Sequence, residues 1–290
     1  MILPDMDEWL PDFLMRSPAF EPLRAQGAAL GTTRWPTLDE MQAVFDARWP
    51  PPVAASGVPL RLVGQGGKPR SFEDKYEARV YLKGELQTRS GNWHDLFNAL
   101  VWLTFPRAKA ALNERHYRAL RQQQAAGASN RGAAQDAMTL FDEGGVVVAA
   151  SDRELLGMLR GFEWKTLFWR NRARVRAGMH FYLFGHALYE KALRPFAGIT
   201  GRAMLFEVEP GLLTAPLAMQ LEKLDTLVAQ RLRDEREIRT TRDLAPLPVL
   251  GVPGWWPDNE HEAYYDDTAH FRPGRGSAPA VPSRTRVSFR

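Results

Sequence analysis

The sequence predicts a mainly helical α+β fold in which residues 1–273 form a single globular domain. Most segments carry apolar residues at helical spacing, with capping residues or prolines at their ends. One segment, 136–150, instead has two apolar runs about a Glu-Gly-Gly turn, which predicts a β-hairpin in a small sheet. With 44% hydrophobic residues and nine tryptophans, the chain can also bury a large core.

The N-terminal region, residues 1–50, is expected to be helical. Residues 5–16 place their large apolar side chains on one side of a short helix. Thr37 and Glu40 have the spacing of a capping box, in which each side chain binds a free backbone N–H of the other residue. This box predicts a helix that runs to about Trp49 and stops at the three following prolines.

The predicted core, 55–273, begins with a short strand at 59–63. A helix is expected from residue 71 to Gly84, which can take the left-handed conformation at a helix end. Alternating apolar residues over 76–82 leave a strand open as the competing interpretation.

Helices dominate the predicted C-terminal half. They are expected at 107–124, over 152–195 with one or two breaks, and at 210–239. Prolines and aromatic residues between 246 and 271 predict a strap that packs across the domain, since disordered segments are poor in aromatic residues. Residues 274–290 are rich in Gly, Ser, Pro and Arg, and we expect them to be disordered.

The stretch 92–106 organises these elements. On a helix its apolar side chains cover almost every face, so the helix should be buried. His94, Asp95 and Asn98 would then lie where an unpaired polar group costs roughly 1–3 kcal/mol. Such a cost indicates either a structural network or a functional site.

Composition excludes several classes of protein. No apolar run approaches the roughly 18–20 residues of a membrane-spanning helix, and the first residues carry acids where a signal peptide has Lys or Arg. We therefore expect a soluble cytoplasmic protein. The absence of cysteine excludes disulfides, thiolate zinc sites and a cysteine nucleophile.

The net charge of +4 suggests nucleic-acid binding as an alternative function. Residues 271–290 carry five arginines and no acid, so the rest of the chain is slightly acidic. Within it, 160–176 interleaves basic residues with Trp164, Phe168 and Trp169, an arrangement that could bind phosphates and stack bases. The candidate contacts are Lys165, Arg170, Arg172, Arg174 and Arg176. A solvated helix face with a buried aromatic side explains the same pattern.

Four segments together resemble one known family. Residues 92–106, 136–145, 181–188 and 247–273 are similar to the bacterial domain-of-unknown-function 3025 family, and the likeness spans most of 55–273. The Trp-His-Asp sequence at 93–95 is its most specific part. The resemblance implies a bacterial, soluble, single-domain protein, and it brings no catalytic residue with it.

The leading functional hypothesis is an enzyme that acts on a small anionic substrate, with hydrolysis as the expected class. A histidine can act as a base near neutral pH, a carboxylate can orient its ring, and an arginine can bind an anion. The residues expected to share such a pocket are His94, Asp95, Asn98, Glu77, Arg79 and Arg89. A closed network that only pins the buried helices together would use the same residues, and the sequence leaves that interpretation open.

A divalent metal is a further candidate. Imidazole and carboxylate groups are suitable ligands for zinc, iron or manganese. The four residues that could bind such an ion are His94, Asp95, His186 and Glu190. Their spacing matches no recognised metal-binding motif, so the prediction depends on the fold to bring them together.

Overall fold

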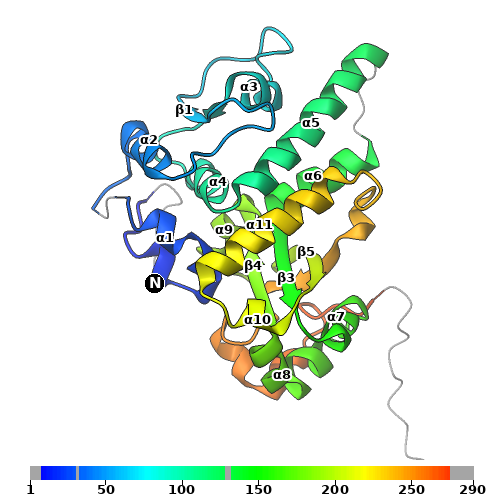
Figure 1. The fold of residues 1–290 in the computed structure, drawn as a ribbon. Helices are drawn as coiled ribbons and strands as arrows, with labels where there is room; N and C mark the ends of the chain where they lie inside the picture. Colours follow the sequence, from blue (N-terminus) through cyan, green and yellow to red (C-terminus); the bar gives the residue numbers. More distant parts are fainter. Residues whose placement is uncertain (1–7, 31–32, 128–131, 275–290) are drawn as a thin grey trace, which may run out of the picture.

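The computed structural model describes residues 8–30, 33–127 and 132–274. It confirms a mainly helical α+β fold built on a small sheet (Figure 1). The helices are α1 (Arg24–Gly27), α2 (Leu38–Ala47), α3 (Tyr76–Lys83), α4 (Trp93–Thr104), α5 (Pro106–Ala126), α6 (Ala133–Gly144), α7 (Arg153–Arg160), α8 (Arg172–Gly178), α9 (His186–Ala192), α10 (Pro210–Leu213) and α11 (Leu217–Arg233). The strands are β1 (Arg61–Val63), β2 (Glu85–Gln87), β3 (Gly145–Ala150), β4 (Met179–Leu183), β5 (Thr200–Glu207) and β6 (Ala245–Pro248).

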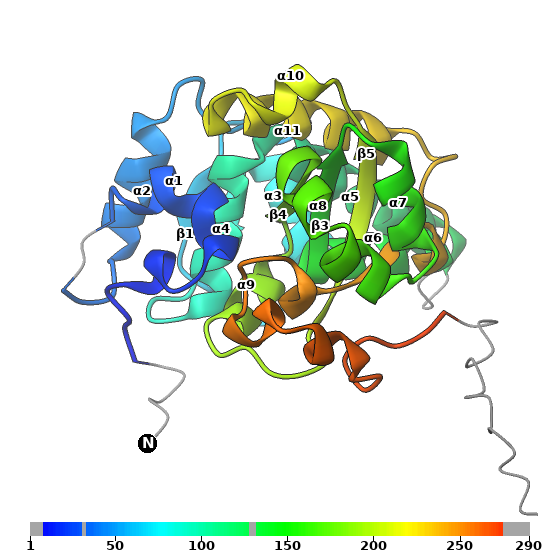
Figure 2. The ribbon, with the colours of Figure 1, turned by 90° about the horizontal axis from the view of Figure 1, so that it is seen from below.

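The main sheet has four strands in the order β4-β3-β5-β6. Its central pair, β3 and β5, is parallel, with Val148 opposite Leu205, and both outer pairs are antiparallel. Every residue of β3 is buried, as expected for a strand that is covered on both faces. Figure 2 shows α11 on one side of this sheet and the C-terminal segment, in orange, on the other. A separate two-stranded sheet pairs β1 with β2 in parallel.

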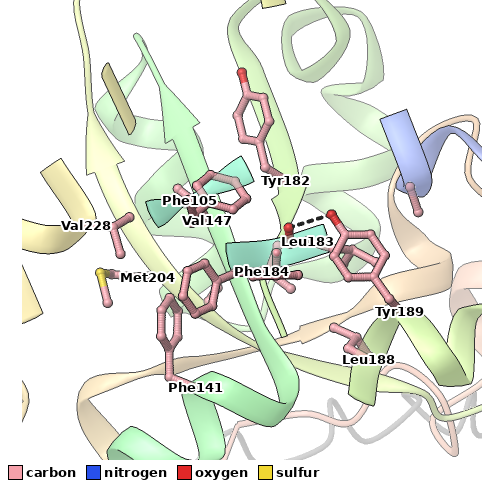
Figure 3. Close-up of a cluster of buried hydrophobic side chains, with 14 of the residues drawn as sticks. Phe105, Phe141, Val147, Tyr182, Leu183, Phe184, Leu188, Tyr189, Met204 and Val228 are labelled. Atoms are coloured by element: carbon pink, nitrogen blue, oxygen red, sulfur yellow. Dashed lines mark hydrogen bonds between the residues drawn. The ribbon is translucent and has the colours of Figure 1, made fainter. Parts of the chain in front are cut away.

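The hydrophobic core is continuous from the sheet to α4 and α5. In Figure 3, Phe105, Phe141 and Phe184 meet beside β3, and the rings of Phe141 and Phe184 stack with their centres 4.6 Å apart. Tyr189 of α9 donates a hydrogen bond from its hydroxyl to the backbone oxygen of Leu183, at 2.7 Å. These contacts fix α9 against the end of β4.

Several predicted boundaries are confirmed by their capping residues. Thr37 and Glu40 form the predicted capping box at the start of α2. Gly84 ends α3 in the left-handed conformation, so the competing strand interpretation of this segment is wrong. Asn92 caps α4 by accepting a hydrogen bond from the backbone N–H of Asp95 at 3.1 Å. Within the described part of 5–16, a single 3-10 turn at Phe13–Met15 replaces the predicted helix.

The predicted hairpin at 136–150 is wrong. Its first half belongs to α6, because Ala137, Met138 and Phe141 have helical spacing and are buried on one side. The two glycines that suggested a turn instead mark the change from α6 to β3, whose partners β4 and β5 come much later in the chain. Strand β4 also interrupts 152–195, where only helix was expected.

The C-terminal segment, 246–271, packs across the domain as the composition predicted. It contains β6 and short 3-10 turns, and it buries Val249, Leu250, Tyr265 and Phe271. The arginine-rich tail that was expected to be disordered lies outside the described residues, apart from its first residue. In the part of the chain that the structure describes, none of the helices has the length and apolar character needed to cross a membrane.

Candidate functional site

A polar cleft of about 880 Å³ opens between α3, α4, α5, α6 and α9. Helix α4 is buried along most of its surface, but His94, Asp95 and Asn98 all line this cleft. The His94 side chain is 31% exposed, so the polar face of α4 is accessible to solvent. The free-energy cost of placing polar groups on this apolar helix is therefore reduced by solvent in the cleft, as well as by hydrogen bonds.

Asp95 and Asn98 are held by neighbouring elements. Asp95 accepts hydrogen bonds from the Nε and Nη2 atoms of Arg89, both at 2.9 Å. Burial acts to raise the pKa of Asp95, but the hydrogen bonds from Arg89 outweigh it and hold this pKa below its usual value. Asn98 donates to the hydroxyl of Tyr76 at 2.8 Å.

His94, His186 and Glu143 converge on one point in the cleft. The Nε2 atoms of His94 and His186 lie 3.0 Å apart, and their rings meet edge to face. A carboxylate oxygen of Glu143 lies 3.7 Å from the Nε2 of His186. The three residues come from α4, α9 and the end of α6, and one potential ligand atom from each lies within 4.8 Å of the others. We call this group the His-His-Glu cluster.

A carboxylate lies behind each imidazole of this cluster. The Nδ1 of His94 lies 3.1 Å from a carboxylate oxygen of Glu190, and this hydrogen bond raises the pKa of His94. The Nδ1 of His186 lies 3.8 Å from Asp142, which forms a buried ion pair with Lys109. Burial lowers the pKa of His186 to about 3, so this ring is neutral at physiological pH.

Close backbone packing brings two members of the cluster together. A Cβ atom at Gly185 would lie 2.5 Å from the backbone oxygen of Glu143 and 2.4 Å from the backbone nitrogen of Gly145. Only glycine allows this approach, which sets His186, the next residue, beside Glu143. The sequence spacing of the two residues gave no sign of this contact.

The remaining predicted pocket residues divide between the cleft and its surroundings. Glu77 lines the cleft, accepts a hydrogen bond from the Nδ2 of Asn113 at 2.6 Å, and has its pKa raised by burial. Arg89 lines the cleft as well. Arg79 does not line it, because its guanidinium is paired with Glu85 of β2.

The predicted metal ligands are also divided. His94 and His186 face each other as such ligands would, whereas Asp95 is engaged by Arg89 and Glu190 binds the opposite nitrogen of His94. Glu143, which the sequence analysis did not select, occupies the third position. It was missed because the segment around it was interpreted as a hairpin turn, where acidic residues are common.

The basic segment 160–176 is largely neutralised within the protein. Lys165 pairs with Asp266 at 2.8 Å, and Arg174 pairs with Asp152 at 2.6 Å. Arg172 and Arg176 both contact Glu260, while Arg170 is exposed. Trp164 and Phe168 are buried in the core, so they do not present free rings to a base. This geometry does not favour the nucleic-acid alternative.

Comparison with known protein families gives a match over most of the chain. Residues 60–275 match the family model described as protein of unknown function (DUF3025). The chain belongs to the DUF3025 family. No curated protein and no solved structure matches it. The part that matches the DUF3025 model includes α3, α4, α6 and α9, and therefore the whole His-His-Glu cluster.

Proposed function

We propose that this DUF3025 protein is an enzyme whose active site is the polar cleft, and that it acts on a small anionic substrate. The observation that carries the proposal is the His-His-Glu cluster, in which three helices direct ring nitrogens and a carboxylate to one point in an open cleft. A network that serves only to pin helices together would be closed. Here the side chains of His94 and Glu143 are 31% and 44% exposed, so a small molecule can reach them.

The chemistry that fits this arrangement is the activation of water for hydrolysis. Glu190 on the Nδ1 of His94 orients the ring and supports positive charge on it, as a carboxylate does for a catalytic histidine. The opposite nitrogen of the ring, Nε2, contacts the Nε2 of His186 at 3.0 Å, so a water molecule would be polarised beside these paired rings. Glu143 lies beside them and can exchange a proton with solvent.

Anion recognition would come from two cations that line the cleft. Arg89 uses its Nε and Nη2 atoms for Asp95, so Nη1 is the donor that it can offer to a substrate. Lys75 also lines the cleft, with its ammonium group 5.7 Å from the ring centre of Phe72. Both side chains suit a carboxylate or phosphate group of a small molecule.

The test is hydrolysis of a panel of small chromogenic esters, including phosphate, sulfate and carboxylate esters. We expect turnover by the wild-type protein, and a loss of roughly 10²–10⁴-fold in His94→Gln, the usual contribution of a general acid or base. His261→Ala is the matched control, because His261 is exposed in the C-terminal segment, outside the cleft lining. Absence of turnover across the panel, or equal rates in His94→Gln and wild type, would overturn the proposal.

A further inference from the structure

We propose that the cleft binds a divalent transition-metal ion, such as zinc, through the Nε2 atoms of His94 and His186 and a carboxylate oxygen of Glu143. The use of the ion in catalysis rests on the proposed function above, whereas its binding does not. The ligand set differs from the one that the sequence predicted. Glu143 takes the place of Asp95 as a ligand. Glu190 does not contact the ion but binds the Nδ1 of His94, one of the ligands.

The distances within the cluster suit such an ion. Two nitrogen ligands at roughly 2.0–2.1 Å from a tetrahedral zinc ion lie about 3.3 Å apart. The two Nε2 atoms are 3.0 Å apart, and the Glu143 oxygen is 3.7 Å from the nearer one. Because Glu143 is only half-buried, a change in its side-chain torsions can bring its carboxylate to the ion. Three protein ligands leave at least one coordination position open towards the cleft.

The outer partners of the two histidines point to the same conclusion. Histidines that bind a metal usually donate their second ring N–H to a carboxylate or carbonyl group. Glu190 holds this position behind His94, at 3.1 Å, and Asp142 is the carboxylate behind His186, at 3.8 Å. With an ion between the rings, both Nδ1 atoms carry protons that face carboxylates.

Without an ion, the arrangement leaves one buried group unsatisfied. When His94 is neutral and donates its Nδ1–H to Glu190, its Nε2 has a lone pair, and His186 then carries its proton on Nε2 to complete the contact. The Nδ1 of His186 would then direct a second lone pair towards Asp142. That nitrogen is buried and has no hydrogen-bond partner among the described residues. An ion at the cluster removes this unfavourable contact.

The charge of the cleft also favours a cation. Four carboxylates line it, against the two cations Lys75 and Arg89. Arg89 neutralises Asp95, and Lys109 neutralises Asp142. Of the other two lining carboxylates, Glu77 is bonded to Asn113 and Glu143 lies beside the two histidines. A bound divalent ion balances Glu143 and Glu190, and it makes the cleft more favourable for an anionic substrate. When bound, such an ion would lower the pKa of a water molecule in the open position.

The experiment measures metal binding directly on the full chain, purified without a polyhistidine tag and stripped with a chelator. Zinc and cobalt(II) are titrated separately, with elemental analysis for stoichiometry and the visible absorption of cobalt(II) for ligand geometry. We expect about one ion per chain. His186→Asn and Glu143→Gln should weaken the affinity by at least tenfold, and Glu190→Gln by roughly 10–100-fold, as found for outer-shell partners.

His116→Asn is the matched control, because His116 lines the same cleft but lies outside the cluster. The affinity of this variant for both ions should equal that of the wild type. Glu143→Gln covers the case in which the buried His186 variant does not fold. Absence of a bound ion in the wild type, or equal weakening in His116→Asn, would overturn the metal site.

The two proposals can fail separately. Stoichiometric binding that depends on the cluster, without hydrolysis of any ester in the panel, would support the metal site and contradict the proposed enzyme. Hydrolysis by fully stripped protein in the presence of chelator, with no zinc or cobalt(II) bound, would support the enzyme and contradict the metal site.

Discussion

At the scale of single residues, Asp225 is a buried carboxylate that joins α11 to the start of α5. It lies on α11, its side chain is 2% exposed, and it accepts hydrogen bonds from the backbone N–H groups of Arg107 and Ala108 at the start of α5. One helix thus caps another. Burial raises the pKa of Asp225 to about 6 despite these hydrogen bonds.

This shift predicts a pH dependence of folding. The unfolded chain releases the Asp225 proton near pH 3.8 and the folded protein near pH 6, so the folded state binds more protons between these values. Raising the pH through this window should therefore lower the unfolding free energy of the wild type relative to Asp225→Asn, by ~3 kcal/mol in total. Urea denaturation of both proteins from pH 4 to 7 measures this difference. A difference that stays constant, or rises with pH, would contradict the assignment.

The sequence placed some site residues correctly because they are neighbours in the chain. His94, Asp95 and Asn98 share one helix, so a single helical pattern was enough to predict that they face the same region. Glu143 could not be found in this way. Its position depends on the contact between Gly185 and the backbone at 143–145, which joins segments about forty residues apart. The catalytic role of the cleft residues stays a prediction.

At the scale of secondary structure, two helix ends offer a matched test of backbone constraint. Gly84 ends α3 with φ of +66°, and a Cβ atom there would lie 2.1 Å from the backbone oxygen of Pro59. Gly127 ends α5 with φ of +62°, but a Cβ atom there meets no atom of the described residues within 4 Å. The two positions share a conformation and differ in available space.

Alanine substitution should separate these two effects. Gly127→Ala should cost ~1–2 kcal/mol of unfolding free energy, the penalty of the left-handed conformation alone. Gly84→Ala should cost clearly more, because the backbone of Pro59 has to move to accommodate the methyl group. Chemical denaturation of the two variants provides the comparison, and equal losses would show that the contact with Pro59 is unimportant.

Helices with caps were predictable from sequence, whereas the strands of the main sheet mostly were not. Thr37, Gly84 and Asn92 act within a few residues of the positions they affect, so their effect is visible locally. Strands β4 and β5 pair with β3 across long connections, and β4 lies in a segment whose apolar residues also fit a helical pattern. Local periodicity therefore could not distinguish a short buried strand from part of a helix.

At the scale of the whole molecule, the C-terminal segment closes one side of the domain through a buried asparagine. Asn259 is fully buried and donates hydrogen bonds to the backbone oxygens of Leu250 and Val252, at 2.9 and 2.7 Å. Its side-chain oxygen accepts a hydrogen bond from Arg172 of α8 at 3.1 Å. Aromatic composition predicted that this segment would pack, but it did not reveal the residue that holds it.

Removal of this side chain should destabilise the protein as a whole. Asn259→Ala leaves the buried carbonyl group of Leu250 without its donor, whereas that of Val252 keeps the backbone N–H of Trp255, so the unfolding free energy should fall by about 1–3 kcal/mol. His261→Ala, an exposed change two residues away, should have almost no effect. Thermal and denaturant unfolding of both variants test this. A loss in Asn259→Ala no larger than that in His261→Ala would contradict the role assigned to Asn259.

The contact at Gly185 also links the cleft to the interior of the protein. His186 begins α9 directly after Gly185. The backbone that packs against Gly185 runs from Glu143 into the first residue of β3. No compressible layer of side chains separates the two segments. An inward shift of the backbone at Gly185 would therefore meet the first residue of β3 directly, so this part of the cleft wall is as rigid as the sheet behind it.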